Sequence, residues 1–313
     1  MTAIKPPRLR KGDIIGLVSP ASTPTPEEKI QRSVRYLEGL GFKVKVGAHA
    51  SKVFGYLAGT DEERAADLNA MIRDPEVKAI FALRGGYGTP RILPAIDYRA
   101  LSRRPKIISG FSDITALQLA IYRKCRLVTF SGPMPAVEFW KNPDAYAEEN
   151  FWRLLTSKAA VGKIENPSEQ NLVVHREGKA SGVLLGGNLA LVLSTLATPF
   201  MPSLRKAVLV VEEVGEYPYR VDRLFAQLRN AGVLKNLAGL LLGQFTDCEP
   251  KDPKQPYLTV AQLLAEYAQM VKGPVLGNLL YGHVPKKLTM PFGLVATVDA
   301  RNGLIEMRES AVA

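Results

Sequence analysis

Between residues 13 and 131 the sequence alternates between strand-like and helix-like segments. Apolar residues recur at helical spacing within residues 30–37 and again within residues 61–73. Apolar or alternating runs of strand length occur at residues 13–19, 42–46, 77–83, 106–110 and 127–131. This alternation is typical of a parallel sheet with helices on its faces, which we expect for the first half of the chain.

The first of these helices has a recognisable start and stop. Thr25 is a suitable N-cap, Pro26 suits the first helical position, and Glu28 completes a capping box. Gly39 and Gly41 then end the apolar spacing. We therefore predict a helix that begins next to Thr25 and ends near residue 39.

The second half of the sequence has a less regular texture. We expect helices at 187–196 and 221–229, and strands at 207–214, 238–244, 294–298 and 304–307. A chain of 313 residues suits two domains by the usual prior of roughly 150 residues per domain. We predict an N-terminal α/β domain with a parallel sheet at 1–150, a linker at 151–171 and a smaller C-terminal domain at 172–313.

Composition argues against several classes of protein. The charge is 41 − 30 = +11, but the basic clusters are short, separated and without interleaved aromatic residues, so we expect no nucleic-acid partner. No apolar stretch approaches the ~20 residues of a membrane-spanning helix, and the N-terminus lacks the apolar region of a secretory signal. The expectation is a cytoplasmic protein without a membrane partner. Cys125 and Cys248 form no CxxC pair, so neither a disulfide framework nor a cysteine-rich zinc site is expected.

Ser112 stands at a position where nucleophiles occur in α/β enzymes. It follows the expected strand 106–110 by two residues and precedes a good helix start, which would expose its hydroxyl at the sheet edge. The match to G-x-S-x-G is imperfect because Ile114 stands where the second glycine would be. An ordinary N-cap serine is the alternative interpretation.

A nucleophilic serine needs a base and a carboxylate that orients the base. Of His49, His175 and His283, position favours His283, which lies in a turn just past an apolar run. Glu212 and Glu213 end the buried strand run 207–211, where an unpaired carboxylate would be costly. Glu216 and Asp222 are competitors that spacing does not exclude.

A glycine-rich turn at residues 84–88 follows the expected strand 77–83. It matches neither G-x-G-x-x-G nor G-x-x-x-x-G-K-[ST], so it gives weak support for a nucleotide site. Its glycines would equally let the backbone approach a substrate and donate an N–H to an oxyanion. A tight turn without function is the remaining alternative.

Several of these motifs occur together in one known family. They are Arg84-Gly85-Gly86-Tyr87-Gly88, Gly110-Phe111-Ser112-Asp113, residues 129–134, residues 186–189, residues 212–220 and Gly282-His283. In this order and at this spacing they resemble the murein LD-carboxypeptidases, serine peptidases of the S66 type. The resemblance runs from about residue 13 to about residue 308.

The resemblance implies an N-terminal α/β domain, a C-terminal β-rich α/β domain, an active site between them and a homodimer. It implies Ser112 as nucleophile, His283 as base and Glu212 as the third member. The oxyanion hole would use the backbone N–H of Asp113 and of Gly85 or Gly86. Arg84, Tyr87 and Arg220 are candidates for substrate contacts.

The implied reaction releases the terminal D-alanine of a muropeptide tetrapeptide, at the L-centre of a diamino acid that is usually meso-diaminopimelate. It uses no cofactor and no metal, and it fits recycling of cell-wall fragments in the cytoplasm. The main alternative is a relative of the microcin C immunity proteins, which process peptidyl or aminoacyl adenylates. Those carry a longer segment between nucleophile and glutamate, whereas Ser112 and Glu212 are 100 residues apart here. A catalytically silent α/β module that binds an anionic ligand is a third hypothesis.

Overall fold

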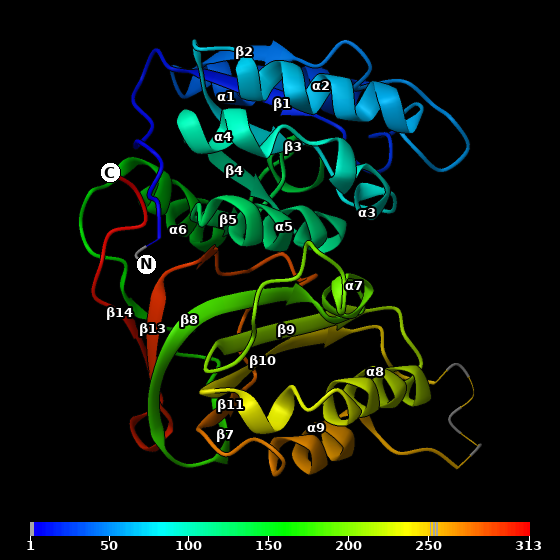
Figure 1. The fold of residues 1–313 in the computed structure, drawn as a ribbon, viewed down its shortest axis with the longest axis vertical. Coiled ribbons are helices and arrows are strands. Elements are labelled where there is room, and N and C mark those ends of the chain that lie inside the picture. The colour runs from blue at the N-terminus through cyan, green and yellow to red at the C-terminus, as the bar shows by residue number, and fades with distance from the viewer. Residues whose placement is uncertain (1–2, 251, 253, 255) are drawn as a thin grey trace.

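The strands of the first half form the central sheet of an α/β unit, seen at the top of Figure 1. The computed structural model describes residues 3–250, 252, 254 and 256–313. In this sheet the strand order is β12-β5-β4-β3-β1-β2, and β1 to β5 run parallel. The bounds are β1 Ile14–Val18, β2 Lys43–Val46, β3 Val77–Ala82, β4 Ile107–Gly110, β5 Thr129–Ser131 and β12 Met290–Phe292. The expected parallel α/β domain is confirmed.

Helices pack along this sheet. They are α1 Glu28–Gly39, α2 Asp61–Arg73, α3 Thr89–Ile92, α4 Tyr98–Arg103, α5 Thr115–Cys125 and α6 Ala145–Thr156. The helix expected at 61–73 is confirmed, and it begins with a capping box between Thr60 and Glu63. The predicted N-cap at Thr25 is wrong. Glu27 occupies the N-cap position without a side-chain hydrogen bond, and the first turn of the helix is closed by Lys29 N, which donates to Pro26 O at 3.0 Å.

The second half forms a mixed sheet of eight strands in the order β6-β14-β13-β8-β9-β10-β11-β7. The strands from β8 to β11 in this order are parallel, and the outer pairings are antiparallel. The bounds are β6 Gly162–Ile164, β7 Val173–Arg176, β8 Lys179–Asn188, β9 Val208–Val214, β10 Gly239–Thr246, β11 Val275–Gly277, β13 Val295–Asp299 and β14 Leu304–Met307. The long, curved β8 joins the antiparallel and the parallel parts of this sheet, because its first half pairs with β13 and its second half with β9 (Figure 1).

Three further helices belong to this half: α7 Leu189–Thr195, α8 Pro218–Asn230 and α9 Val260–Ala268. The helix predicted from residue 187 begins two residues later. Gly186 and Gly187 still belong to β8, and a Cβ on Gly186 would lie 1.8 Å from Val210 O of β9. These glycines therefore serve close strand pairing, and Asn188 then caps α7 by accepting from Leu191 N.

The chain crosses between the two units more than once. α6 extends across residue 150, where the domain boundary was expected, and β6 lies inside the expected linker. The linker was expected because that region is polar, yet Phe151 and Leu155 of α6 are fully buried. β12 comes from the C-terminal part of the sequence and pairs antiparallel with β5 of the first sheet.

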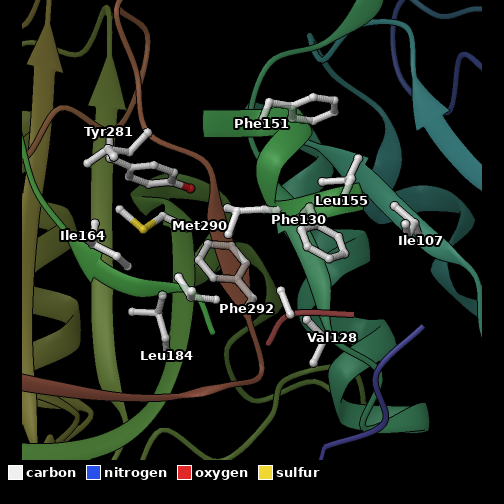
Figure 2. Packing of buried hydrophobic residues seen from close by; sticks show 14 of the residues in the cluster. Ile107, Val128, Phe130, Phe151, Leu155, Ile164, Leu184, Tyr281, Met290 and Phe292 are labelled. Atoms are coloured by element: carbon white, nitrogen blue, oxygen red, sulfur yellow. The ribbon is translucent and has the colours of Figure 1, made fainter. Parts of the chain in front are cut away.

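A shared hydrophobic core joins the units at this crossing (Figure 2). Phe130 of β5 lies beside Met290 and Phe292 of β12, and Leu184 of β8 and Tyr281 lie on the opposite side. Each buried side chain of this size stabilises the fold by ~1.5–3 kcal/mol. The core therefore fixes the first sheet against the loop that carries residue 283. Within the described ranges no helix combines the length and apolarity needed to cross a bilayer.

Candidate active site

Three side chains from distant parts of the chain meet where the two units join. Ser112 Oγ lies 3.0 Å from His283 Nε2, and His283 Nδ1 lies 2.7 Å from Glu212 Oε2. Ser112 follows β4, Glu212 lies in β9, and His283 lies in the loop between β11 and β12. With the proton on Nδ1, the imidazole donates to Glu212 and accepts from the Ser112 hydroxyl. This is the order of contacts that a serine nucleophile, a base and an orienting carboxylate require.

The backbone holds Ser112 in an unusual conformation. Its φ is +64°, in the left-handed region that residues with a side chain rarely adopt. Phe111 occupies the cap position of the short 3-10 helix Ser112–Ile114, and α5 follows from Thr115. The alternative interpretation of Ser112 as an N-cap is therefore wrong, and its hydroxyl contacts His283 instead.

Glu212 is buried completely, with 0% of its surface exposed. A buried carboxylate is costly unless it is paired, and His283 is its pairing partner. The backbone comes close on two sides, since a Cβ on Gly243 or Gly282 would lie 3.2 or 3.0 Å from the Glu212 Cβ. Among the described residues, Glu212 Oε1 has no hydrogen-bond partner.

Glu213 points away from this set and has a structural environment of its own. Its carboxylate accepts from Asn188 Nδ2 at 2.7 Å, Ala190 N at 2.9 Å and Val214 N at 2.9 Å. Burial raises the pKa of the Glu213 carboxyl. The contacts anchor the start of α7 to β9, so the two neighbouring acids have separate surroundings.

The other candidate acids and bases are not part of this set, and three of them have partners elsewhere. Glu216 pairs with Arg220 at 3.4 Å, and Asp222 accepts from Tyr267 Oη. His49 Nδ1 lies 2.8 Å from Asp67, and burial lowers the pKa of His175. Of these eight candidate residues, the structure joins Ser112, His283 and Glu212 by hydrogen bonds and places the other five elsewhere.

The glycine-rich turn lies directly against Ser112. A Cβ on Gly85 would lie 2.9 Å from Ser112 Cβ and 3.3 Å from Asp113 N. Ser22 holds the turn, because Ser22 N donates to Gly85 O at 3.3 Å and Ser22 Oγ accepts from Tyr87 N at 3.1 Å. This close approach places the backbone of Gly85 beside that of Asp113, next to the hydroxyl.

Asp113 fixes the other side of the same turn. Its Oδ2 accepts from Thr89 N at 2.8 Å, and burial raises the pKa of its carboxyl. The fully buried Arg64 also reaches the turn, where its Nη1 donates to Gly88 O at 3.0 Å. Arg64 gave no recognisable signal in the sequence, where it is one of two arginines in the predicted helix 61–73.

The three residues proposed for substrate contacts lie outside the hydrogen-bonded set. Arg84 Nη1 donates to Thr23 O at 3.3 Å, and Tyr87 is half exposed and packs edge-on against Tyr56. Arg220 pairs with Glu216. In the described part of the chain, none of these three side chains hydrogen-bonds to Ser112, His283 or Glu212.

Two charged residues near His283 were not expected from the sequence. Lys287 Nζ lies 2.7 Å from Glu138 Oε1 and 3.9 Å from the centre of the Phe111 ring. That ring lies 4.8 Å from the His283 ring. The contacts are long-range in sequence, and only the four-residue spacing of Lys287 from His283 could have suggested them.

Taken together, these groups can carry out nucleophilic acyl transfer. The serine is within hydrogen-bond distance of a base, the base is oriented by a buried carboxylate, and backbone N–H groups lie beside the hydroxyl. The described residues contain no cluster of three or more His, Cys, Asp or Glu side chains that could hold a metal ion.

Comparison with known families gives two matches along the chain. The LD-carboxypeptidase N-terminal domain of the peptidase S66 family matches residues 15–132, and the corresponding C-terminal domain matches residues 181–298. The probable murein peptide carboxypeptidase of Bacillus subtilis (strain 168) is 38% identical to this chain, with 94% of this chain and 91% of that protein covered.

Solved structures give the same fold. A structure of the microcin C7 self-immunity protein MccF in complex with aspartyl sulfamoyl adenosine is similar at a TM-score of 0.90 and 28% identity, covering 99% of this chain and 100% of that chain. By sequence, MccF of Escherichia coli is 29% identical, with coverage of 96% and 94%. The muramoyltetrapeptide carboxypeptidase from Oxalobacter formigenes has a TM-score of 0.81 and 29% identity, covering 94% of this chain and 97% of that chain.

Proposed function

Because the chain belongs to the peptidase S66 family of LD-carboxypeptidases, we propose that it releases the terminal D-alanine from muropeptide tetrapeptides. Family membership makes it a serine-type carboxypeptidase, a hydrolase. The bond in question joins the L-centre of a diamino acid such as meso-diaminopimelate to D-alanine. The observation that carries the proposal is the continuous hydrogen-bonded set of Ser112, His283 and Glu212.

In this proposal Ser112 attacks the carbonyl carbon while His283 Nε2 takes its proton. The same nitrogen then protonates the amine of D-alanine, the C–N bond breaks, and an acyl-enzyme remains on Ser112. A water molecule, deprotonated by His283, hydrolyses this ester and restores the serine. Glu212 holds the imidazole in the Nδ1–H form and stabilises the imidazolium, 2.7 Å from Nδ1.

The negative charge that develops on the carbonyl oxygen requires donors. We assign this role to the backbone N–H of Asp113 and of Gly85 or Gly86; Gly85 lies directly against Ser112, and Gly86 follows it in the turn. The Ser22, Asp113 and Arg64 contacts keep this turn in place before substrate arrives. Arg84, Tyr87 and Arg220 remain candidates for contacts to more distant parts of the peptide.

The microcin immunity reaction is the second candidate, supported by the similarity to MccF. The murein peptide carboxypeptidase relative supports the first candidate at higher identity. The two functions differ in the leaving group, an amino acid in one and a nucleotide in the other. Parallel assays with a muropeptide tetrapeptide and an aminoacyl sulfamoyl adenosine separate them.

We place the reaction in the cytoplasm and in a homodimer, as the resemblance implies. Both cysteines are buried and free, which suits a reducing compartment. Cell fractionation and analytical ultracentrifugation test these two points separately. A monomer at working concentrations would contradict the proposed homodimer but would leave the proposed reaction unaffected.

The decisive experiment is mass spectrometry of purified tetrapeptide incubated with the protein. The expected products are the tripeptide and one D-alanine, and Ser112→Ala should abolish their formation. Glu212→Gln should lower kcat by about 10³–10⁴-fold, because the imidazole loses the partner that fixes its tautomer. Glu213→Gln is the matched control and should have a milder effect. The reverse order of severity would move the orienting role to Glu213.

A further inference from the structure

A cavity of about 310 Å³ opens beside the His283 ring. Its lining combines Phe111 and His283 with residues 137–138 and 141–144. This volume lies at the lower end of the ~300–1,000 Å³ that is usual for small-molecule sites. The cavity therefore has room for a small ligand in contact with the imidazole.

The chemistry of the site determines which part of a substrate lies on this side. The imidazole that takes the proton of Ser112 must deliver it to the departing nitrogen. That nitrogen must come within hydrogen-bond reach of His283 Nε2, about 2.6–3.2 Å. The released amino acid is thus the part of the substrate that lies next to His283.

The leaving group of a carboxypeptidase carries a free carboxylate, so its subsite needs an available cation. Two lysines line the cavity, Lys141 and Lys287. The Lys287 side chain is only 3% exposed, and its ammonium already pairs with Glu138 at 2.7 Å. Lys141 is exposed and has no ion-pair partner among the described residues, and its Nζ lies 5.7 Å from the centre of the Trp140 ring.

The geometry points to this cavity as the subsite for the released amino acid, with Lys141 binding its α-carboxylate. The inference rests on the proposed carboxypeptidase function. It gives Lys141 a specificity role, because a peptide that continued for further residues beyond the scissile bond would present no free α-carboxylate in this cavity. Lys287 and Glu138, already paired, form the wall of the subsite.

The test compares two substrates, a tetrapeptide with a free terminal carboxylate and the same tetrapeptide as its terminal amide. Wild type should prefer the free acid in kcat/KM by about 10–100-fold, the usual effect of a hydrogen bond to a charged group. Lys141→Met should remove most of this preference by slowing the acid alone, and Lys141→Arg should retain much of it. Inhibition by free D-alanine should weaken in Lys141→Met.

Lys29→Met is the matched control. Lys29 Nζ also lies over the Trp140 ring, at 5.0 Å, but Lys29 is in α1 and does not line the cavity. Its preference for the free acid should equal that of wild type. This control separates loss of the cavity cation from loss of a contact to Trp140.

The two possible failures are distinguishable. If wild type releases the terminal amino acid but Lys141→Met keeps the full preference for the free acid, the subsite inference is overturned and the proposed function stands. Equal kcat/KM values of wild type for the free-acid and amide tetrapeptides would also overturn the subsite inference. If wild type releases no amino acid from the tetrapeptide, the proposed function falls and the subsite with it.

Discussion

Ser112 combines a strained backbone with the hydroxyl that contacts the base. A left-handed conformation costs a residue with a side chain roughly 1–2 kcal/mol relative to glycine. Serine nevertheless stands there at φ +64°, with Oγ 3.0 Å from His283 Nε2. The same backbone conformation that costs stability also places the hydroxyl against His283, and such strain is common at functional sites.

Comparing Ser112→Gly with Ser112→Ala isolates this strain, since both variants lack the hydroxyl. We expect both to lose at least about 10³-fold in kcat, because the proposed nucleophile is gone. Ser112→Gly should be more stable than Ser112→Ala by roughly 1 kcal/mol, measured by urea denaturation. Equal stability of the two variants would refute the strain.

Glu213 gives stability a dependence on pH. Its folded-state pKa is raised by burial above the ordinary value of about 4.3. The stabilisation linked to its protonated form is therefore complete below the unfolded pKa and is lost as pH rises through the folded pKa. Glu213→Gln does not titrate at this position.

We therefore expect the difference in Tm between Glu213→Gln and wild type to become more positive from about pH 4 to about pH 8. Asp113, whose pKa burial also raises, is present in both proteins and cancels. Calorimetric scans across this range measure the trend. A difference that falls with rising pH would contradict the assigned direction.

At the scale of elements, β8 pairs with β9 so closely that only glycine fits at one position. A Cβ on Gly186 would lie 1.8 Å from Val210 O, whereas a Cβ on Gly215 would meet nothing within 4 Å. Both glycines have positive φ, so an alanine at either position carries backbone strain. Only the first substitution also forces two strands apart.

We expect Gly186→Ala to destabilise the protein by about 3 kcal/mol or more, and Gly215→Ala by roughly 1 kcal/mol. Urea denaturation of the two variants measures the difference. Similar losses in both would mean that β8 can shift to accept a methyl group. Such a shift would also move Glu212, which pairs in register with Asn188.

At the scale of the whole molecule, one buried hydrogen bond connects the loop of His283 to the first sheet. Tyr281 Oη lies 2.7 Å from Ser131 Oγ, and both residues are buried. Tyr281→Phe and Ser131→Ala should each cost about 1–2 kcal/mol, since either leaves a buried partner unsatisfied. The double variant should cost less than the sum of the two, which a double-mutant cycle of unfolding free energies measures. Full additivity would show that the bond contributes nothing.

The sequence predicts the first sheet well because buried parallel strands are continuous apolar runs. It misses β12, whose three residues include Pro291 and gain their strand character only from pairing with β5. It also extends α7 backwards over Gly187 and Asn188, since a glycine before an apolar run resembles a turn as much as a strand. The missed elements are those specified by contacts distant in sequence.

The same limit applies to the site. Strand alternation shows that Glu212 and Glu213 face opposite sides of β9, but not which side meets His283. The resemblance to a family, and not the local pattern, favoured Glu212. Lys287 contacts Glu138 and Phe111 only after three segments distant in sequence pack together, so no local pattern predicts this cluster.

The segment that carries His283 is fastened at its two ends to different sheets, to β11 in one and to β12 in the other. A shift of one sheet relative to the other would therefore also move the His283 imidazole relative to Ser112. Substitutions in the shared core between the two sheets should therefore lower kcat before they lower Tm. Activity is then the more sensitive measure of how well the two sheets are packed together.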